Sequence, residues 1–100
     1  MLGEKIKSLR EAQGLVLRQV AAHLDVDIAY ISKMEHGNKP ISRVHIQKLA
    51  ALYDVPESEL TTLWLSDKIV NLVKGEAVCE DSLKLTLNRL VLYEYNKHNN

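Results

Sequence analysis

The sequence has one cysteine, no phenylalanine, two prolines and four glycines in 100 residues. A single thiol, Cys79, cannot form an internal disulfide, which excludes a disulfide-stabilised fold and favours a reducing compartment. No apolar run approaches the roughly eighteen residues that cross a bilayer, and no apolar signal segment follows Met1. We therefore expect a cytoplasmic protein without a membrane segment.

Chemistry-bearing patterns are also scarce. The sequence has no glycine-rich phosphate loop and no nucleophile with a base at a readable spacing. The four histidines have no metal-ligand spacing with Cys79; they are His23, His36, His45 and His98. We expect no enzyme activity, no metal, no cofactor and no small-molecule ligand.

What the sequence does contain is aliphatic. Hydrophobic residues make up 46% of the chain and aromatic residues only 5%. With so few prolines and glycines, long helices are permitted, and an all-α fold is predicted. The net charge is zero, but residues 1–55 carry eight Lys/Arg against six acids, whereas residues 56–100 carry five against seven. This mild asymmetry has the sign expected of a basic binding half beside a neutral or acidic half.

Two short helices with a tight connection are predicted within residues 17–37. Leu17, Val20, Ala21 and Leu24 recur at the spacing of one helix face, which predicts a helix over residues 17–24. A second helix is predicted over residues 28–36, with Asp27 as a side-chain N-cap and Gly37 at its end. Because neither helix is long enough to bury its apolar stripe alone, a helix-turn-helix arrangement is favoured.

The rest of the chain predicts four more helices. One covers residues 3–13, one follows the cap Ser42 as far as Tyr53, one runs from Pro56 toward Gly75, and the last covers about residues 79–95. We divide the chain into a helix-turn-helix domain of residues 1–60, a helical dimerisation extension of residues 61–96 and a flexible polar tail of residues 97–100.

The extension predicts a partner. Its helices are apolar on more than one side, and such a helix needs more than one neighbour. We predict a homodimer whose interface includes Leu65, Ile69, Leu72, Leu83, Leu87, Leu90 and Tyr93. The alternative is an antitoxin or adaptor that binds another protein through the same helices.

With these residues in view, the chain resembles the Cro and phage-repressor helix-turn-helix family, also called XRE. The resemblance covers roughly residues 3–60 and rests on the combined spacing of Leu9-Arg10, Gly14-Leu15, Val20-Ala21, Leu24, Val26, Tyr30-Ile31-Ser32, Glu35, Gly37 and the run from Leu49-Ala50 to Val55. It implies a five-helix domain like that of lambda repressor, and a transcriptional regulator that binds a palindromic operator in double-stranded DNA as a dimer. The size and the extension look similar to small controller proteins of restriction-modification systems.

The resemblance also implies roles for individual residues. The helix over residues 28–36 enters the major groove, and base readout falls to Asp27, Ile28, Ala29, Ser32 and Lys33. Contacts to the DNA backbone fall to Arg18, His36, Asn38, Lys39 and Arg43; for His36, a passive helix end is the alternative. Arg10 and Glu35 occupy the positions of a structural ion pair.

The sequence departs from the family pattern at two places. Val16 and Leu17 stand where a cap and a polar DNA contact are common, and Ile28 and Ala29 stand where polar base readers are common. Readout therefore depends on thymine methyl groups, on Lys33 and on DNA shape. A degenerate module without DNA binding stays open at this point.

Overall fold

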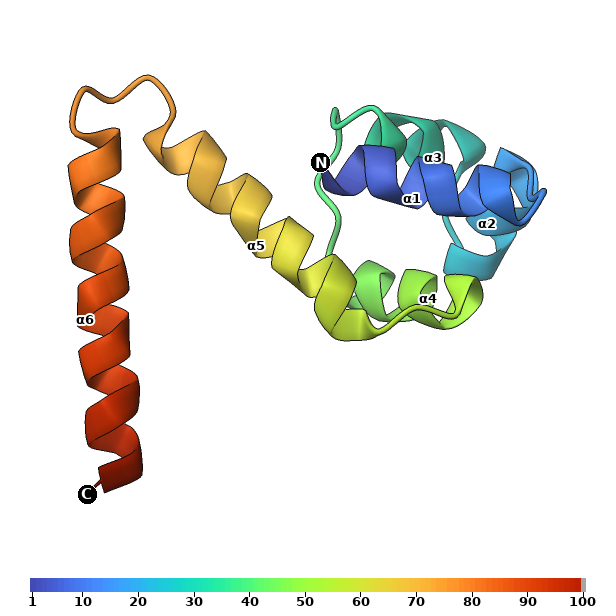
Figure 1. The fold of residues 1–100 in the computed structure, drawn as a ribbon. Coiled ribbons are helices and arrows are strands. Elements are labelled where there is room, and N and C mark those ends of the chain that lie inside the picture. The colour runs from blue at the N-terminus through green and yellow to red at the C-terminus, as the bar shows by residue number, and fades with distance from the viewer. Residues whose placement is uncertain (100) are drawn as a thin grey trace. The chain divides into compact units, whose positions relative to one another are not determined.

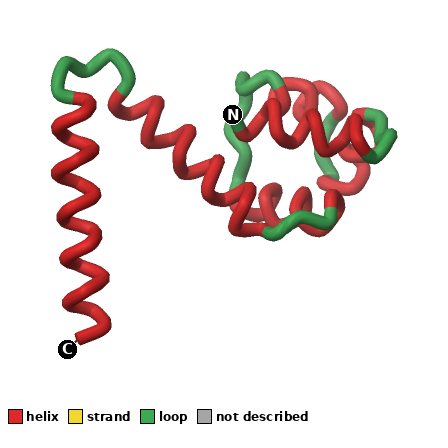
Figure 2. Tube along the Cα trace, in the orientation of Figure 1, coloured by secondary structure: helices red, strands yellow, loops and turns green. Residues whose placement is uncertain are grey.

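A computed structural model describes residues 1–99 as six helices, and no strand occurs among these residues (Figures 1 and 2). The all-α prediction is confirmed. In chain order the helices are α1 (Leu2–Ala12), α2 (Leu17–Leu24), α3 (Ile28–Glu35), α4 (Arg43–Tyr53), α5 (Glu57–Val73) and α6 (Cys79–Asn99). The chain divides into two units, Met1–Ile69 and the part from Val70 onward, with the boundary inside α5. Within residues 1–99, no helix combines the length and apolar character needed to span a bilayer.

The helix boundaries agree closely with the sequence pattern in the first unit. Helix α2 begins and ends at the predicted residues, and α1, α3, α4 and α5 begin or end within one or two residues of expectation. The last helix is longer than predicted. It continues through residues 97–99, which belong to the expected polar tail; residue 100 lies outside the described residues.

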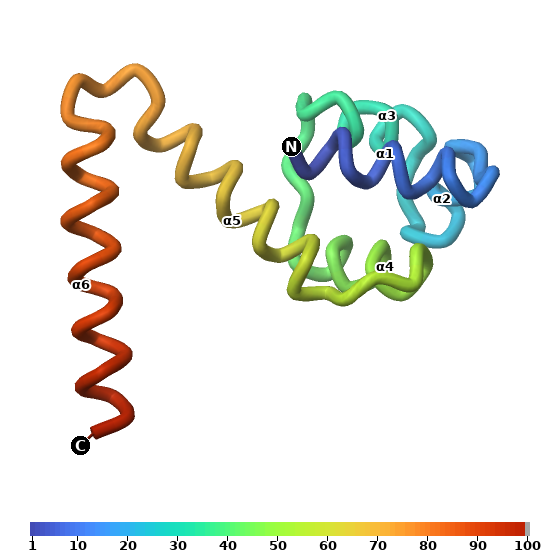
Figure 3. Tube along the Cα trace, viewed as in Figure 1, coloured from blue at the N-terminus to red at the C-terminus, as the bar shows by residue number. Residues whose placement is uncertain are grey.

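The first unit has an aliphatic core to which all its helices contribute. Helices α2 and α3 pack directly on each other, in the blue-to-cyan part of the trace (Figure 3). The buried apolar side chains are Leu2, Ile6, Val20, Ala21, Leu24, Ile31, Met34, Ile41, Ile46, Leu49, Ala50, Tyr53 and Leu60. Burial of such side chains is the main favourable term in folding. This unit therefore holds its helix-turn-helix in a fixed arrangement.

The α2–α3 turn depends on an aspartate in an unusual conformation. Asp25 ends α2 with φ 57°, in the left-handed region, and Val26 N–H then donates to the Ala21 carbonyl oxygen at 3.0 Å. Helices commonly end this way with glycine, and aspartate tolerates it better than most residues. The same device ends α4 at Asp54, with φ 54°. In both places the following valine packs on the core.

Two predictions about helix starts need revision. Asp27 stands at the N-cap position of α3, but its side chain accepts no capping hydrogen bond, so the predicted cap is wrong. At α2, where no cap was expected, Gln19 supplies part of one: its Oε1 accepts a hydrogen bond from Val16 N–H at 2.9 Å. Ser42 does cap α4, accepting from His45 N–H at 3.2 Å.

A buried ion pair joins α1 to the end of α3. Arg10 Nε lies 2.8 Å from Glu35 Oε2, and Arg10 Nη2 lies 3.1 Å from Glu35 Oε1. The Glu35 side chain is only 3% exposed and that of Arg10 13%. The hydrogen bonds that Arg10 donates to Glu35 raise the pKa of Arg10 above its ordinary value. Arg10 also donates to the Leu15 carbonyl oxygen at 3.0 Å, so one side chain connects α1, the following loop and α3.

Tyr53 lies beside this pair in the core. Burial raises the pKa of Tyr53 to about 12, and the negative charge of Glu35 adds to the shift while Arg10 opposes it. The phenol is therefore neutral at physiological pH. Its hydroxyl has no hydrogen-bond partner among the described residues.

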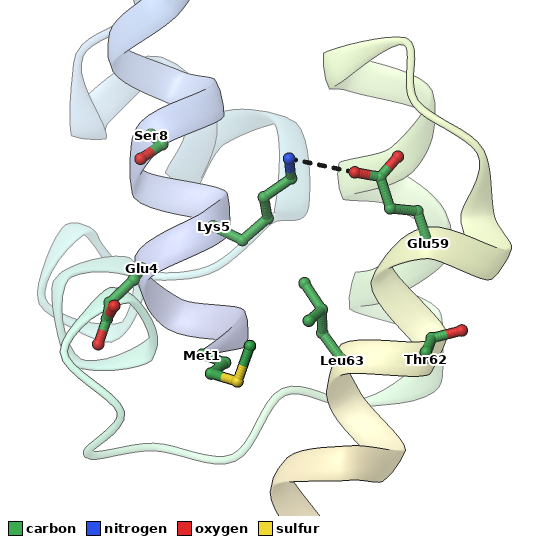
Figure 4. A pocket seen from close by; sticks show the side chains of 7 residues that line it. All are labelled: Met1, Glu4, Lys5, Ser8, Glu59, Thr62 and Leu63. Atoms are coloured by element: carbon green, nitrogen blue, oxygen red, sulfur yellow. Dashed lines mark ion pairs between the residues drawn. The ribbon is translucent and has the colours of Figure 1, made fainter.

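The beginning of α5 packs along α1 with a shallow groove between them (Figure 4). Lys5 Nζ lies 3.1 Å from Glu59 Oε1 across this groove. Farther along α5, Asp67 Oδ2 accepts a hydrogen bond from Leu2 N–H at 2.9 Å, and the amino terminus lies 3.4 Å from Asp67 Oδ1. These contacts hold α5 against the first helix as far as residue 67.

Gly3 marks a close approach of α1 to the end of α3. A Cβ atom at this position would lie 2.5 Å from the Glu35 carbonyl oxygen and 2.8 Å from that of Met34. Both atoms belong to the backbone, so neither can rotate away. Only glycine fits without displacing the end of α3.

We expect Gly3→Ala to destabilise the domain. Overpacking typically costs about 1–3 kcal/mol, which exceeds the roughly 1 kcal/mol that alanine gains over glycine inside a helix. Urea unfolding followed by circular dichroism measures the difference, with the exposed Ser8→Ala on the same helix as control. A Gly3→Ala protein as stable as the wild type would show that α1 and α3 are not in close contact.

We expect Arg10→Met to cost about 3–5 kcal/mol of unfolding free energy, because it leaves the buried Glu35 carboxylate without its partner. The double variant Arg10→Met/Glu35→Met removes both charges and should recover most of that loss. The same urea experiment tests both. Equal stability of the wild type and Arg10→Met would contradict the buried pair.

Candidate nucleic-acid interface

One side of α3 is buried and the opposite side is open. Ile31, Met34 and Glu35 face the core. Residues four apart share a face of a helix, so Ile28 with Ser32 and Ala29 with Lys33 make up the side of α3 away from the core. They form what we call the α3 ridge, which consists of Ile28, Ala29, Ser32 and Lys33. Ile28, Ala29 and Lys33 are exposed and Ser32 is half-buried.

The ridge is mixed in character. Ile28 is 48% exposed, and Ala29 adds a second apolar group beside it. Lys33 supplies the only positive charge of the ridge. Asp27, just before it, is also exposed and carries a negative charge. The ridge therefore offers methyl groups, a hydroxyl and an ammonium group to a ligand, with one carboxylate at its edge.

The start of α2 lies next to the start of α3. Arg18 and Ile28 line the same open depression on the surface, together with Val16, Leu17 and Arg10. Arg18 is exposed. The structure thus brings the predicted backbone contact Arg18 beside the predicted base contact Ile28, although ten positions separate them in the chain.

The loop after α3 carries three more predicted residues. Asn38 N–H donates to the Lys33 carbonyl oxygen at 2.8 Å, which folds the loop back onto the end of α3. Gly37 makes this possible with φ 78°. Asn38 and Lys39 are exposed beside the ridge. His36 Nδ1 lies 2.7 Å from the Ser32 carbonyl oxygen, and since a carbonyl only accepts, this nitrogen carries a proton.

Two aromatic side chains anchor this loop from different helices. The Tyr30 hydroxyl donates to the Pro40 carbonyl oxygen at 3.2 Å. The Trp64 indole N–H, from α5, donates to the Ile41 carbonyl oxygen at 2.6 Å. The consecutive carbonyl groups of Pro40 and Ile41 therefore each accept a hydrogen bond from a side chain of a different helix. These two bonds hold the loop in place before α4 begins.

Arg43, the first residue of α4, extends from this anchored loop. Its Cζ lies 5.0 Å from the centroid of the Trp64 ring, and Lys68 Nζ lies 3.9 Å from the same centroid. Both cations are exposed. Within residues 1–99, no acidic side chain lies within 4.0 Å of the five surface cations Arg18, Lys33, Lys39, Arg43 and Lys68.

The sequence pattern did not predict that Trp64 holds the loop through Ile41 or that Lys68 and Arg43 lie over the Trp64 ring. The i, i+4 spacing of Trp64 and Lys68 on a predicted helix was the available signal, because such pairs are neighbours on the helix surface. Nothing local connects them to Ile41 and Arg43, which are more than twenty positions earlier. The described residues also contain no group of three or more His, Cys, Asp or Glu side chains suited to a metal ion.

Comparison with known proteins agrees with this geometry. Residues 1–63 match the family described as helix-turn-helix domain. Control protein C.MunI of Mycoplasma sp is 37% identical over 59 residues, which cover 58% of this chain and 80% of that protein. A solved SinR protein/SinI protein complex has a chain with a TM-score of 0.53 at 22% identity, covering 95% of this chain and 99% of that one; at this identity the likeness shows the fold alone. The chain belongs to the helix-turn-helix family of DNA-binding regulators.

Proposed function

We propose that this protein is a sequence-specific repressor that binds a palindromic operator as a homodimer, with one α3 in each of two major-groove half-sites. The observation that carries the proposal is the exposed α3 ridge, flanked by surface cations that have no acidic partner within residues 1–99. A major groove admits one helix, and an outward helix face beside positive charge fits it.

Base readout falls to the ridge. Lys33 donates to O6 and N7 of guanine, the commonest specific contact, and Ile28 and Ala29 pack on thymine methyl groups. Ser32 bonds a base edge or a phosphate. Asp27 lies at the edge of the ridge, where its charge disfavours close approach of a phosphate and so restricts how α3 enters the groove.

Backbone contacts fall to the residues around the ridge. They are Arg18, His36, Asn38, Lys39 and Arg43, all of them exposed. Phosphate contacts supply affinity and fix the register of a protein on the duplex, whereas base contacts discriminate between sequences. The anchored loop holds Asn38 and Lys39 next to the end of α3 and leads directly to Arg43.

Dimerisation falls to the C-terminal helices. No residue of α6 is buried within a single chain, and Leu87, Leu90 and Tyr93 are 63%, 55% and 61% exposed. A second copy covers these side chains, together with Leu65, Ile69, Leu72 and Leu83. Twofold symmetry then gives two equivalent α3 helices, spaced for half-sites about 34 Å apart or a multiple of that distance.

The regulated genes are proposed from resemblance. A relative named a control protein, together with the small size and helical extension, favours autoregulation or control of restriction-modification genes. A dimer that covers its own promoter acts by keeping other proteins off that DNA, which is why we assign repression. A mobility-shift assay with the DNA upstream of its own gene tests this, and no shift at low salt would overturn it.

We expect Lys33→Ala and Arg43→Ala to affect binding in different ways. Loss of Lys33 should cost about 1–3 kcal/mol on the operator and little on unrelated DNA. Loss of Arg43 should weaken binding to both and reduce the slope of log K against log salt by about one. Fluorescence anisotropy with operator and scrambled duplexes distinguishes the two effects. If Arg43→Ala leaves the salt slope unchanged, Arg43 does not bind a phosphate.

The second candidate function is an adaptor or antitoxin whose partner protein covers α6. The same exposed side chains favour it, since a different protein would bury them equally well.

Light scattering separates the two. For the regulator we expect the purified wild type to have the mass of a dimer and Leu90→Asp that of a monomer, because a buried charge opposes association. Asn88→Asp, on the side of α6 opposite the stripe of Leu83, Leu87 and Leu90, introduces the same charge at an exposed position and should stay dimeric. A wild-type monomer that aggregates until a neighbouring gene product is added would favour the adaptor.

A further inference from the structure

Trp64 has two cations beside one ring. Arg43, on α4, and Lys68, on α5, lie 5.0 and 3.9 Å from its centroid. Trp64 is the only tryptophan of the chain and is half-buried, while both cations are exposed. All three residues belong to the first unit.

The ring is held in place. Its indole N–H donates to the Ile41 carbonyl oxygen at 2.6 Å, and its body packs on the core. The Asp67 neighbour of Lys68 is occupied elsewhere, since it accepts from Leu2 N–H and pairs with the amino terminus. The ring is therefore fixed relative to the loop that leads to Arg43.

The two charges are not neutralised. No acidic side chain of residues 1–99 lies within 4.0 Å of either cation. At 0.1 M salt the Debye length is about 10 Å, larger than any separation that the two ring distances allow, so the cations repel one another. A cation–π contact is worth about 0.5–1 kcal/mol at an exposed site and leaves the charge in place. Binding of an anion at this position removes the repulsion.

We propose that Lys68 is a DNA-backbone contact, which acts with Arg43 on phosphates of the same strand segment and extends the interface from the α3–α4 loop onto α5. This inference rests on the proposed function. A polyanion fits better than a single small anion because Arg43 directly continues the loop that carries Asn38 and Lys39, and Trp64 holds that loop through the Ile41 carbonyl oxygen while Lys68 lies over the same ring. Trp64 is the positioning residue, because it fixes both the loop and the two cations.

The test uses duplex DNA of arbitrary sequence, because phosphate contacts do not depend on sequence. Anisotropy of a labelled duplex is measured with the wild type, Lys68→Gln, Lys68→Arg and the control Lys48→Gln, an exposed lysine on α4. Between about 50 and 200 mM salt we expect Lys68→Gln to reduce the slope of log K against log salt by about one. Lys68→Arg and Lys48→Gln should keep the wild-type slope. Trp64 emission should change when DNA is added.

The possible results distinguish failure of the Lys68 assignment from failure of the proposed DNA-binding function. If the wild type does not bind duplex DNA at low salt, the proposed function fails and this inference fails with it. If the wild type binds but Lys68→Gln keeps the wild-type slope, or loses no more than Lys48→Gln, only the assignment of Lys68 is overturned. Equal melting temperatures of the four proteins show that the comparison concerns binding.

Discussion

Burial of one side of α3 is the constraint on which the rest of the structure depends. Ile31 and Met34 enter the core and Glu35 enters it as half of an ion pair. In a helix of only eight residues, fixing these three positions also fixes where the remaining ones point. The α3 ridge is open to solvent because the opposite side of α3 is buried in the core. A helix-turn-helix protein needs one buried side and one exposed side of this helix to contact DNA.

Contacts with α1 and with the loop after α3 fix the position of the α3 ridge relative to the residues around it. Arg10 ties its last turn to α1, where Gly3 allows the backbones to touch. Tyr30 and Trp64 fix the loop that follows. A buried ion pair contributes little net stability compared with an apolar replacement, but breaking one partner is costly, so the pair specifies an arrangement more than it strengthens one. Rigid support of this kind positions groups that contact a ligand.

Sequence periodicity was sufficient for the helices and for which side of α3 is buried, because both are local properties with a period near 3.6 residues. It failed at two local helix caps and where a contact joins distant segments. The predicted side-chain cap at Asp27 is wrong, since the Asp27 carboxylate accepts no hydrogen bond from the first turn of α3. At α2, Gln19 accepts a capping hydrogen bond from Val16 N–H that the sequence pattern did not predict. The base and backbone roles stay predictions. The contribution of Trp64 and Lys68 was missed because it depends on α5 returning to the α3–α4 loop.

The central claim is that the α3 ridge lies against DNA while the opposite end of the domain stays in solvent. Cysteine protection measures this directly. In a Cys79→Ser background, Ala29→Cys places a thiol on the ridge and Ala51→Cys places one on the exposed side of α4. We expect duplex DNA to slow alkylation at position 29 and leave position 51 unchanged. Equal reactivity of position 29 with and without saturating DNA would contradict the account.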